Sequence, residues 1–110
     1  MKEFKIRQKW EDMMGYAYIA LRHIPKSERF TLGSEIRNCL ITGLKDIIKA
    51  NIARNKLPII YSIDINIKIL FSLIRVAADM QILPFKKYEI LSEKLTEIGK
   101  MVGGWIKSCR

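Results

Sequence analysis

The fold is decided by residues 63–78, which read IDINIKILFSLIRVAA. Residues 63–69 alternate isoleucine with Asp64, Asn66 and Lys68, a period of two that is typical of a half-buried strand. Apolar positions in the same stretch also follow helical steps of three and four: Ile63, Ile67, Leu70, Ile74 and Ala77. No hairpin signal or second strand occurs elsewhere, and a lone strand would leave its backbone groups unpaired. The stretch therefore predicts a helix over residues 62–82.

Three other segments repeat apolar residues at steps of three and four, which predicts helices over residues 5–23, 31–55 and 86–108. Pro25, Pro58 and Pro84 lie between the periodic segments and mark their boundaries. Thr31 is expected to cap the helix that follows it by accepting a hydrogen bond from a backbone N–H. The chain is thus predicted to be an all-α, antiparallel up-down-up-down four-helix bundle, one domain over residues 1–110.

The predicted helix at 62–82 is apolar on nearly all sides, which favours burial on one face in its own bundle and on another against a second subunit. We expect Ile65, Ile69, Phe71 and Arg75 at that oligomer interface.

Targeting signals are weak in this sequence. The polar residues between Leu57 and Ile74 argue against a membrane span, and the first residues lack the apolar run of a signal peptide. Cys39 and Cys109 lie too far apart in sequence to suggest a disulfide framework or a zinc ribbon. A cytoplasmic protein with reduced thiols and no membrane partner is expected.

Three glycines, Gly99, Gly103 and Gly104, lie inside the predicted helix at 86–108, where each costs about 1 kcal/mol relative to alanine. Two explanations are open. Gly99 and Gly103 allow a neighbouring helix to approach closely, or the helix ends in a frayed turn at Gly103.

The chain is strongly basic, with 20 Lys and Arg against 11 Asp and Glu and a net charge of +9. Residues 22–56 carry +5, residues 85–110 carry +3 and residues 57–84 carry none of the excess. This predicts a phosphate-backbone contact that is sequence-tolerant and salt-dependent, although a solvated helix surface is the commoner reason for such charge. No exposed aromatic row is apparent, so stacking on single-stranded bases is not expected. The candidate nucleic-acid-binding residues are Arg22, Lys26, Arg29, Arg37, Lys45, Lys49, Arg54, Lys56 and Lys100.

No arrangement of residues indicates catalysis. His23 is the one histidine and is expected at a helix C-terminus, where the helix dipole favours it. Cys39 is expected to be a small core residue, and Asp64 and Asp79 are too far apart along one helix to share a site. Phosphate-binding loops and metal-ligand motifs are missing from the sequence. We therefore expect no enzyme activity, no metal and no cofactor.

Several short motifs make the chain resemble a known family. The motifs are Ile24–Phe30 (IPKSERF) followed by Ile36-Arg37, Ile60–Asp64 (IYSID), Leu73–Arg75 (LIR) and Glu97–Ile106 (EIGKMVGGWI). Together they resemble the four-helix accessory variability determinant (Avd) proteins of diversity-generating retroelements, over nearly the whole chain. They also resemble the related four-helix proteins encoded in intervening sequences of 23S ribosomal RNA genes, which share the Pro-Lys-x-Glu-Arg-Phe turn.

The Avd resemblance implies a non-catalytic accessory protein that forms a barrel-shaped homopentamer. Such a protein binds template RNA or cDNA and associates with the reverse transcriptase to support mutagenic retrohoming. Arg75 matches an arginine of the family pattern, so it is also a candidate for nucleic-acid contact, besides its alternative role in an ion pair between subunits. The ribosomal relatives imply a structural or protein-interaction module instead.

Overall fold

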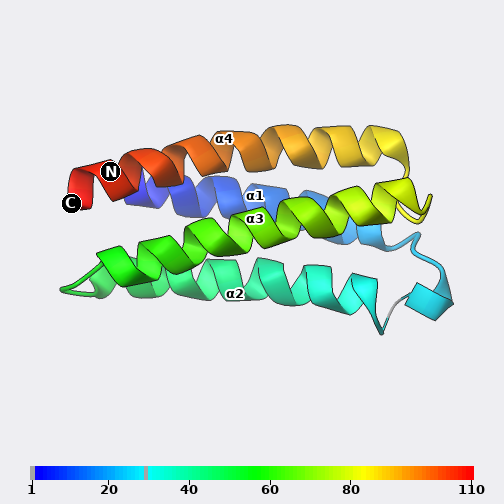
Figure 1. Cartoon of the computed structure of the whole chain (residues 1–110), viewed down its shortest axis with the longest axis horizontal. Coiled ribbons are helices and arrows are strands. Elements are labelled where there is room, and N and C mark those ends of the chain that lie inside the picture. Colours follow the sequence, from blue (N-terminus) through cyan, green and yellow to red (C-terminus); the bar gives the residue numbers. More distant parts are fainter. Residues whose placement is uncertain (1, 29) are drawn as a thin grey trace.

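Four antiparallel helices run the length of the molecule (Figure 1). The computed structural model describes the backbone of residues 2–28 and 30–110 and the side chains from Phe4 on, apart from Arg29. The helices are α1 (Lys2–Leu21), α2 (Leu32–Ile52), α3 (Leu57–Asp79) and α4 (Phe85–Cys109), and the short 3₁₀ helix η1 (Lys26–Glu28) lies between α1 and α2. The described residues contain no strand. The predicted all-α four-helix bundle is confirmed.

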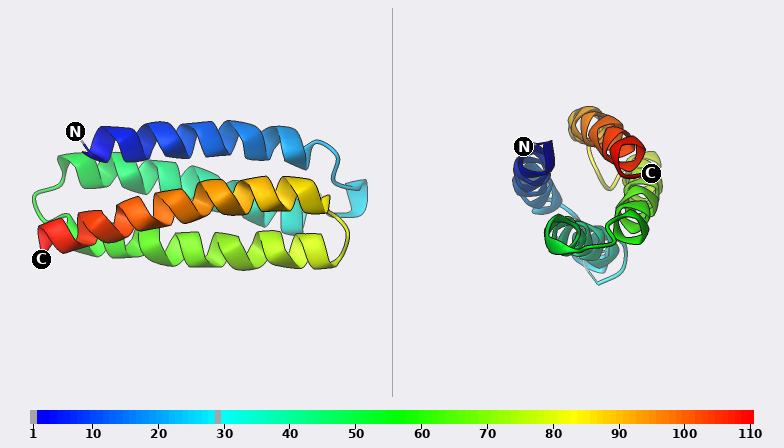
Figure 2. Two further views of the ribbon diagram at one scale, coloured as in Figure 1. Left: turned by 90° about the horizontal axis from the view of Figure 1, so that it is seen from above. Right: turned by 90° about the vertical axis from the view of Figure 1, so that its left-hand side faces the viewer.

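Each helix packs against two others, because α1 and α3 both contact α2 and α4 (Figure 2). Both ends of the chain and the α2–α3 connection lie at one end of the bundle, and the other two connections lie at the opposite end (Figure 1). This arrangement follows from an even number of antiparallel helices joined by short connections.

The alternating isoleucines of residues 63–69 lie on a helix, as predicted. Ile63 and Ile67 point into the core with Leu70, whereas Ile65 and Ile69 are 58% and 47% exposed. A strand would have put all four isoleucines on one face. As a helix, α3 leaves an apolar face outside the bundle, so its expected second burial, against another subunit, stays a prediction.

The boundaries of α3 differ from the predicted 62–82. The helix begins at Leu57 because Pro58 fits the first turn, where its missing N–H has no partner to lose. It ends at Asp79 because Gln81 adopts a left-handed conformation with φ of 59°. The N–H groups of Ile82 and Leu83 then donate to the carbonyl oxygen of Ala77, which completes a Schellman-type end.

The predicted side-chain cap of α2 is wrong. Thr31 does precede the helix, but its hydroxyl donates to a carboxylate oxygen of Glu28 at 3.1 Å and makes no bond to a helix N–H. At the other end α2 stops at Ile52, short of the predicted residue 55, because Ala53 is extended. The remaining helices end within three residues of the predicted bounds.

Two polar side chains fix α2 in the core. The indole N–H of Trp10 donates to the carbonyl oxygen of Leu40 at 2.8 Å, and the buried amide of Asn66 donates to the carbonyl oxygen of Cys39 at 2.7 Å. Cys39 itself packs against the core, as predicted. These bonds tie α1 and α3 to neighbouring residues of α2.

Packing within the bundle does not require glycine at positions 99 and 103 of α4. A Cβ atom at Gly99 would meet Ile67 at 3.9 Å, an ordinary contact, and one at Gly103 would meet nothing within 4 Å. Close approach of a helix within the bundle is therefore the wrong explanation for these glycines. A frayed end at Gly103 is wrong as well, because α4 continues to Cys109.

α3 is long and apolar enough to cross a membrane, with a mean hydropathy of 1.7 over its most apolar 18 residues. From the sequence, the polar residues of this segment were expected to make it too polar for a membrane span. That expectation is wrong, because the polar residues are too few to lower the mean hydropathy of the helix below that of a spanning segment. A core helix of a bundle meets the same test of length and composition, and α3 packs against α2 and α4.

Candidate nucleic-acid interface

Positive charge is concentrated at the end of the bundle that holds the chain termini. Residues 4–9, 49–61 and 98–110, which we call the basic end, contain nine Lys and Arg and no Asp or Glu. They belong to the first turns of α1, the α2–α3 connection with its flanking turns and the second half of α4 (Figure 1). The nine residues are Lys5, Arg7, Lys9, Lys49, Arg54, Lys56, Lys100, Lys107 and Arg110.

Three of these nine side chains already have partners. Arg7 pairs with Glu11 at 3.2 Å, and Lys9 pairs with Glu97 at 2.8 Å. The ammonium of Lys56 turns back and donates to the carbonyl oxygens of Ala50 and Asn51 at 2.8 and 2.9 Å, which caps the C-terminus of α2.

Six residues of the basic end have exposed side chains and form no ion pair with any carboxylate that the structure describes: Lys5, Lys49, Arg54, Lys100, Lys107 and Arg110. They come from the start of α1, from α2, from the connection after α2 and from the second half of α4 with its C-terminus. The local charge is therefore unbalanced, and phosphate groups could approach these side chains without displacing a protein partner.

The sequence places Arg37, Lys45, Lys49 and Lys56 at steps of about four or its multiples, which predicts one outward basic face on α2 and its C-terminal flank. In the structure this face is shorter. Lys45 and Lys49 are exposed and lie one turn apart, but Arg37 is half-buried and its guanidinium lies over Gly33. Eight residues separate Arg37 from Lys45, and at 3.6 residues per turn that spacing rotates the side chain by roughly 80° around the helix. Arg37 and the capping Lys56 thus leave the predicted row, of which Lys45 and Lys49 remain. Arg54, which was not predicted in that row, is exposed in the connection after α2.

Of the other candidate residues, Lys100 belongs to the basic end and the rest lie outside it. Arg22 and Lys26 are exposed at the opposite end of the bundle, Lys100 is exposed on α4, and Arg29 lies outside the described residues. Arg75 is exposed on α3, with its Nε atom 4.0 Å from a carboxylate oxygen of Asp79. Among the expected interface residues, Ile65 and Ile69 are exposed on the same helix, whereas Phe71 is partly buried against the core.

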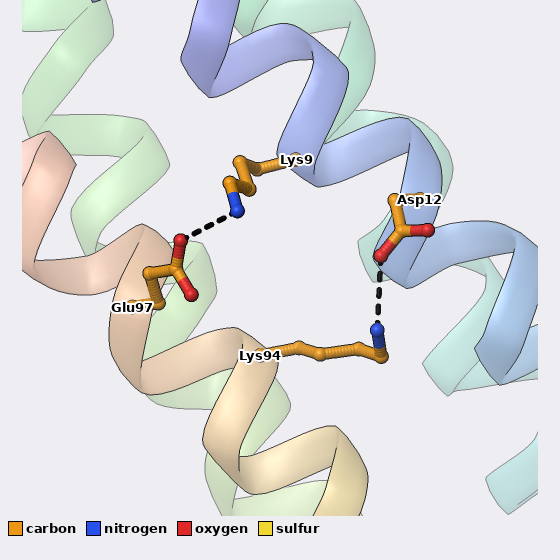
Figure 3. A network of polar contacts seen from close by, with 4 residues as sticks. All are labelled: Lys9, Asp12, Lys94 and Glu97. Atoms are coloured by element: carbon orange, nitrogen blue, oxygen red, sulfur yellow. Dashed lines mark hydrogen bonds and ion pairs between the residues drawn. The ribbon is translucent and has the colours of Figure 1, made fainter.

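Paired charges neutralise the face between α1 and α4. Lys9 pairs with Glu97, and Lys94 of α4 pairs in the reverse sense with Asp12 at 2.9 Å (Figure 3). The hydrogen bond to Glu97, and then the negative charge of Glu97, raise the pKa of Lys9. Lys94 also lies 5.7 Å from the ring centroid of Tyr16.

Sequence reasoning missed the contributions of Lys107 and Arg110. Counting charge by segment placed them with α4, far from residues 49–56 in sequence. The signal was nevertheless available, because an antiparallel bundle of four helices brings the α2–α3 connection to the same end as both chain termini.

Groups suited to catalysis or metal binding are dispersed. Within residues 2–28 and 30–110 no three His, Cys, Asp or Glu side chains come together as a metal site would require. Asp64 pairs with Lys68 at 2.7 Å on the surface of α3, four turns from Asp79. Burial, and to a lesser degree Glu35, raise the pKa of the Cys39 thiol, which disfavours the reactive thiolate.

Comparison with known proteins places the chain in one family. The model of the bAvd-like family matches residues 4–109, which include all four helices and both ends of the bundle. None of the curated proteins compared with the chain is significantly similar to it. On the match over nearly its whole length, the chain belongs to the bAvd-like family of accessory proteins.

Proposed function

We propose that this protein is the accessory subunit of a diversity-generating retroelement, where it binds template RNA or cDNA and associates with the reverse transcriptase during mutagenic retrohoming. Membership of the bAvd-like family supports the accessory role. The observation that carries nucleic-acid binding is the basic end, with nine Lys and Arg and no Asp or Glu. The protein would act in the cytoplasm, where it has no catalytic step of its own.

Binding at the basic end works through phosphate neutralisation. Lys49, Arg54, Lys107 and Arg110 approach from separate elements, so they can contact successive phosphates without reading bases. Each phosphate contact releases counterions, and log K falls with log salt by about 0.9 for every phosphate neutralised on duplex DNA. Binding is therefore expected to be tolerant of sequence and steeply dependent on salt.

Assembly would multiply this charge. We propose a homopentamer that buries the exposed face of α3, with Ile65, Ile69 and Phe71 supplying apolar contact. If the rotation axis of such a ring runs parallel to the helices, symmetry places the basic ends of all protomers on one rim. Arg75 serves either an ion pair across the subunit interface or a phosphate contact, since its guanidinium is exposed next to that face.

The experiment compares charge reversals at the two ends of the bundle. Binding of a labelled duplex is measured by fluorescence anisotropy in low salt for the wild type, for Lys49→Glu/Arg54→Glu and for Arg22→Glu. We expect the double variant to lose most of the binding, and Arg22→Glu, which reverses a charge at the opposite end, to lose little. If the wild type does not bind any RNA or DNA in the micromolar range at low salt, the proposed interface is wrong.

Association with the reverse transcriptase has its own test. Co-expression with the reverse transcriptase of the same genetic locus is expected to yield a complex that copurifies and makes cDNA from its template, whereas the enzyme alone makes less. A gene located inside a ribosomal RNA operon, with no reverse transcriptase nearby, would instead support the structural role of the ribosomal relatives.

A further inference from the structure

The end of the bundle opposite the basic end contains an open hollow of about 480 Å³. One wall is the α1–α2 connection, with His23 and Pro25, and the other is the α3–α4 connection, from Gln81 to Phe85. The two connections lie at the same end of the molecule (Figures 1 and 2). The volume falls within the roughly 300–1,000 Å³ of ordinary small-ligand sites, so the hollow can accept a nucleobase.

An exposed aromatic ring stands in the wall of this hollow. Phe85 is 66% exposed although it is apolar, and its ring is supported by Tyr88, with centroids 5.8 Å apart at an interplanar angle of 43°. Phe85 follows Pro84, which holds the start of α4 in place. The ring thus offers an exposed planar surface at the start of α4, of the kind on which a base can stack.

The surroundings of the ring are positive. Lys86 and Lys87 follow Phe85 directly, and Lys26 follows Pro25 in the other wall. Of the nearby carboxylates, Asp79 faces Arg75, and Glu28 accepts a hydrogen bond from Thr31. Glu89, one turn after Phe85 on α4, is exposed and forms no ion pair with a described residue, so three lysines face one unpaired carboxylate around the ring. An anion attached to a base in the hollow would therefore meet lysine ammonium groups.

We propose that the hollow holds an unpaired base of single-stranded nucleic acid, stacked on Phe85, while Lys26 and Lys86 contact the neighbouring phosphates. The inference rests on the proposed nucleic-acid binding and adds the form of nucleic acid that this end recognises. Bases inside a duplex already stack on one another and cannot enter, so the hollow selects single strands, loops or strand ends. The sequence expectation of no stacking surface overlooked Phe85, because a single aromatic residue at a helix start makes no row.

The test uses a single-stranded oligonucleotide with 2-aminopurine, whose fluorescence falls when it stacks on an aromatic ring. Phe85→Ala is expected to weaken binding about tenfold and to abolish the quenching, in line with the loss of one stacked base. Phe85→Tyr should retain both. The matched control is Phe30→Ala, which removes a ring that is 90% exposed but does not line the hollow. Thermal unfolding of each variant verifies the fold.

The remaining outcomes separate the two proposals. Equal weakening of single-strand and duplex binding by Phe85→Ala, or no weakening of either, would overturn the stacking site while leaving the basic end intact. Complete absence of binding by the wild type at low salt defeats nucleic-acid binding itself. Displacement of the oligonucleotide by a glutamate-rich peptide, with the same dependence on Phe85, would show that the hollow takes an acidic protein segment.

Discussion

The indole ring of Trp10 lies directly over Gly43, so closely that a Cβ atom on Gly43 would come under 3.0 Å from three carbon atoms of the ring. Trp10 is fully buried, and its N–H donates to the carbonyl oxygen of Leu40, one turn earlier on α2. The ring therefore cannot move away without breaking a buried hydrogen bond. This contact sets the distance between α1 and α2.

We expect Gly43→Ala to lower the free energy of unfolding by about 2 kcal/mol, because overpacking costs more than the gain in helix propensity. Gly15→Ala is the matched control, since a Cβ atom there would meet nothing within 4 Å and the residue is exposed on α1. It should stabilise by about 1 kcal/mol. Urea unfolding at one protein concentration measures both, and equal effects of the two substitutions would disprove the contact.

Asn66 is the one buried polar residue among the residues that the structure describes, and it lies on the apolar helix α3. Its amide donates to the carbonyl oxygen of Cys39, so Asn66→Ala should destabilise by about 1 kcal/mol through loss of a largely buried hydrogen bond. Asn66→Asp should cost more, because a carboxylate would face a carbonyl oxygen. Asn38→Ala, an exposed asparagine on α2, is the control and should change the free energy of unfolding little. A tolerated Asn66→Asp would contradict the geometry.

The Lys9–Glu97 pair predicts a pH-dependent contribution to stability. The pKa of Lys9 is raised above its ordinary value of 10.5, so this contribution is fully present below that pH and disappears as pH rises through the higher pKa of the folded state. Lys9→Met should have a lower melting temperature than the wild type at pH 7. The difference should shrink as the pH rises above 10.5 and the ammonium of the folded state loses its proton.

The control for this experiment is Lys5→Met, because Lys5 is exposed on the same helix and forms no ion pair with a described carboxylate. Its difference from the wild type should be small at both pH values. A deficit of Lys9→Met that is the same at pH 7 and at high pH would mean that the ion pair contributes nothing. High salt should reduce the deficit as well, since the pair is exposed.

Gln81 has the one positive φ angle among the described residues other than glycine. Because a left-handed conformation costs a residue with a Cβ atom about 1–2 kcal/mol, we expect Gln81→Gly to stabilise by about 0.5–1 kcal/mol after the greater chain entropy of glycine is subtracted. Ser72→Gly, at an exposed position inside α3, should destabilise by about the same amount. Differential scanning calorimetry distinguishes the expected stabilisation by Gln81→Gly from the expected destabilisation by Ser72→Gly.

The helices were predictable because burial of one face dominates their stability. The spacing of Ile63, Ile67 and Ile74 predicted a helix where local alternation favoured a strand, and the structure buries these three residues. Their ends were less predictable, because they depend on single local interactions. The left-handed Gln81 and the hydrogen bond from Thr31 to Glu28 have no distinctive pattern in sequence.

The positive charge of the candidate interface was predictable from the sequence, whereas the residues that form it were predictable only in part. Net charge indicated a polyanionic partner, and Lys45, Lys49 and Arg54 belong to the exposed residues that the sequence suggested. The sequence could not show that Lys56 is used as a helix cap, because that role depends on how the chain turns after Ala53. Charge counts by segment did not bring Lys107 to the same end of the bundle as the α2–α3 connection, although the predicted antiparallel topology implies that placement.

Arg54 and Lys56, two residues apart, are expected to separate binding from stability. Arg54 is exposed and forms no ion pair with a described carboxylate, so Arg54→Ala should reduce the slope of log K against log salt by about 0.9 for duplex DNA and leave unfolding unchanged. Lys56→Ala should leave the slope nearly unchanged and destabilise by about 1 kcal/mol, because two carbonyl oxygens at the end of α2 lose their donor. Anisotropy titrations at several salt concentrations and urea unfolding measure the two quantities. If Lys56→Ala reduced the slope as much as Arg54→Ala, its ammonium would have to leave the helix cap on binding, and the division of the basic end into capping and phosphate-binding residues would be wrong.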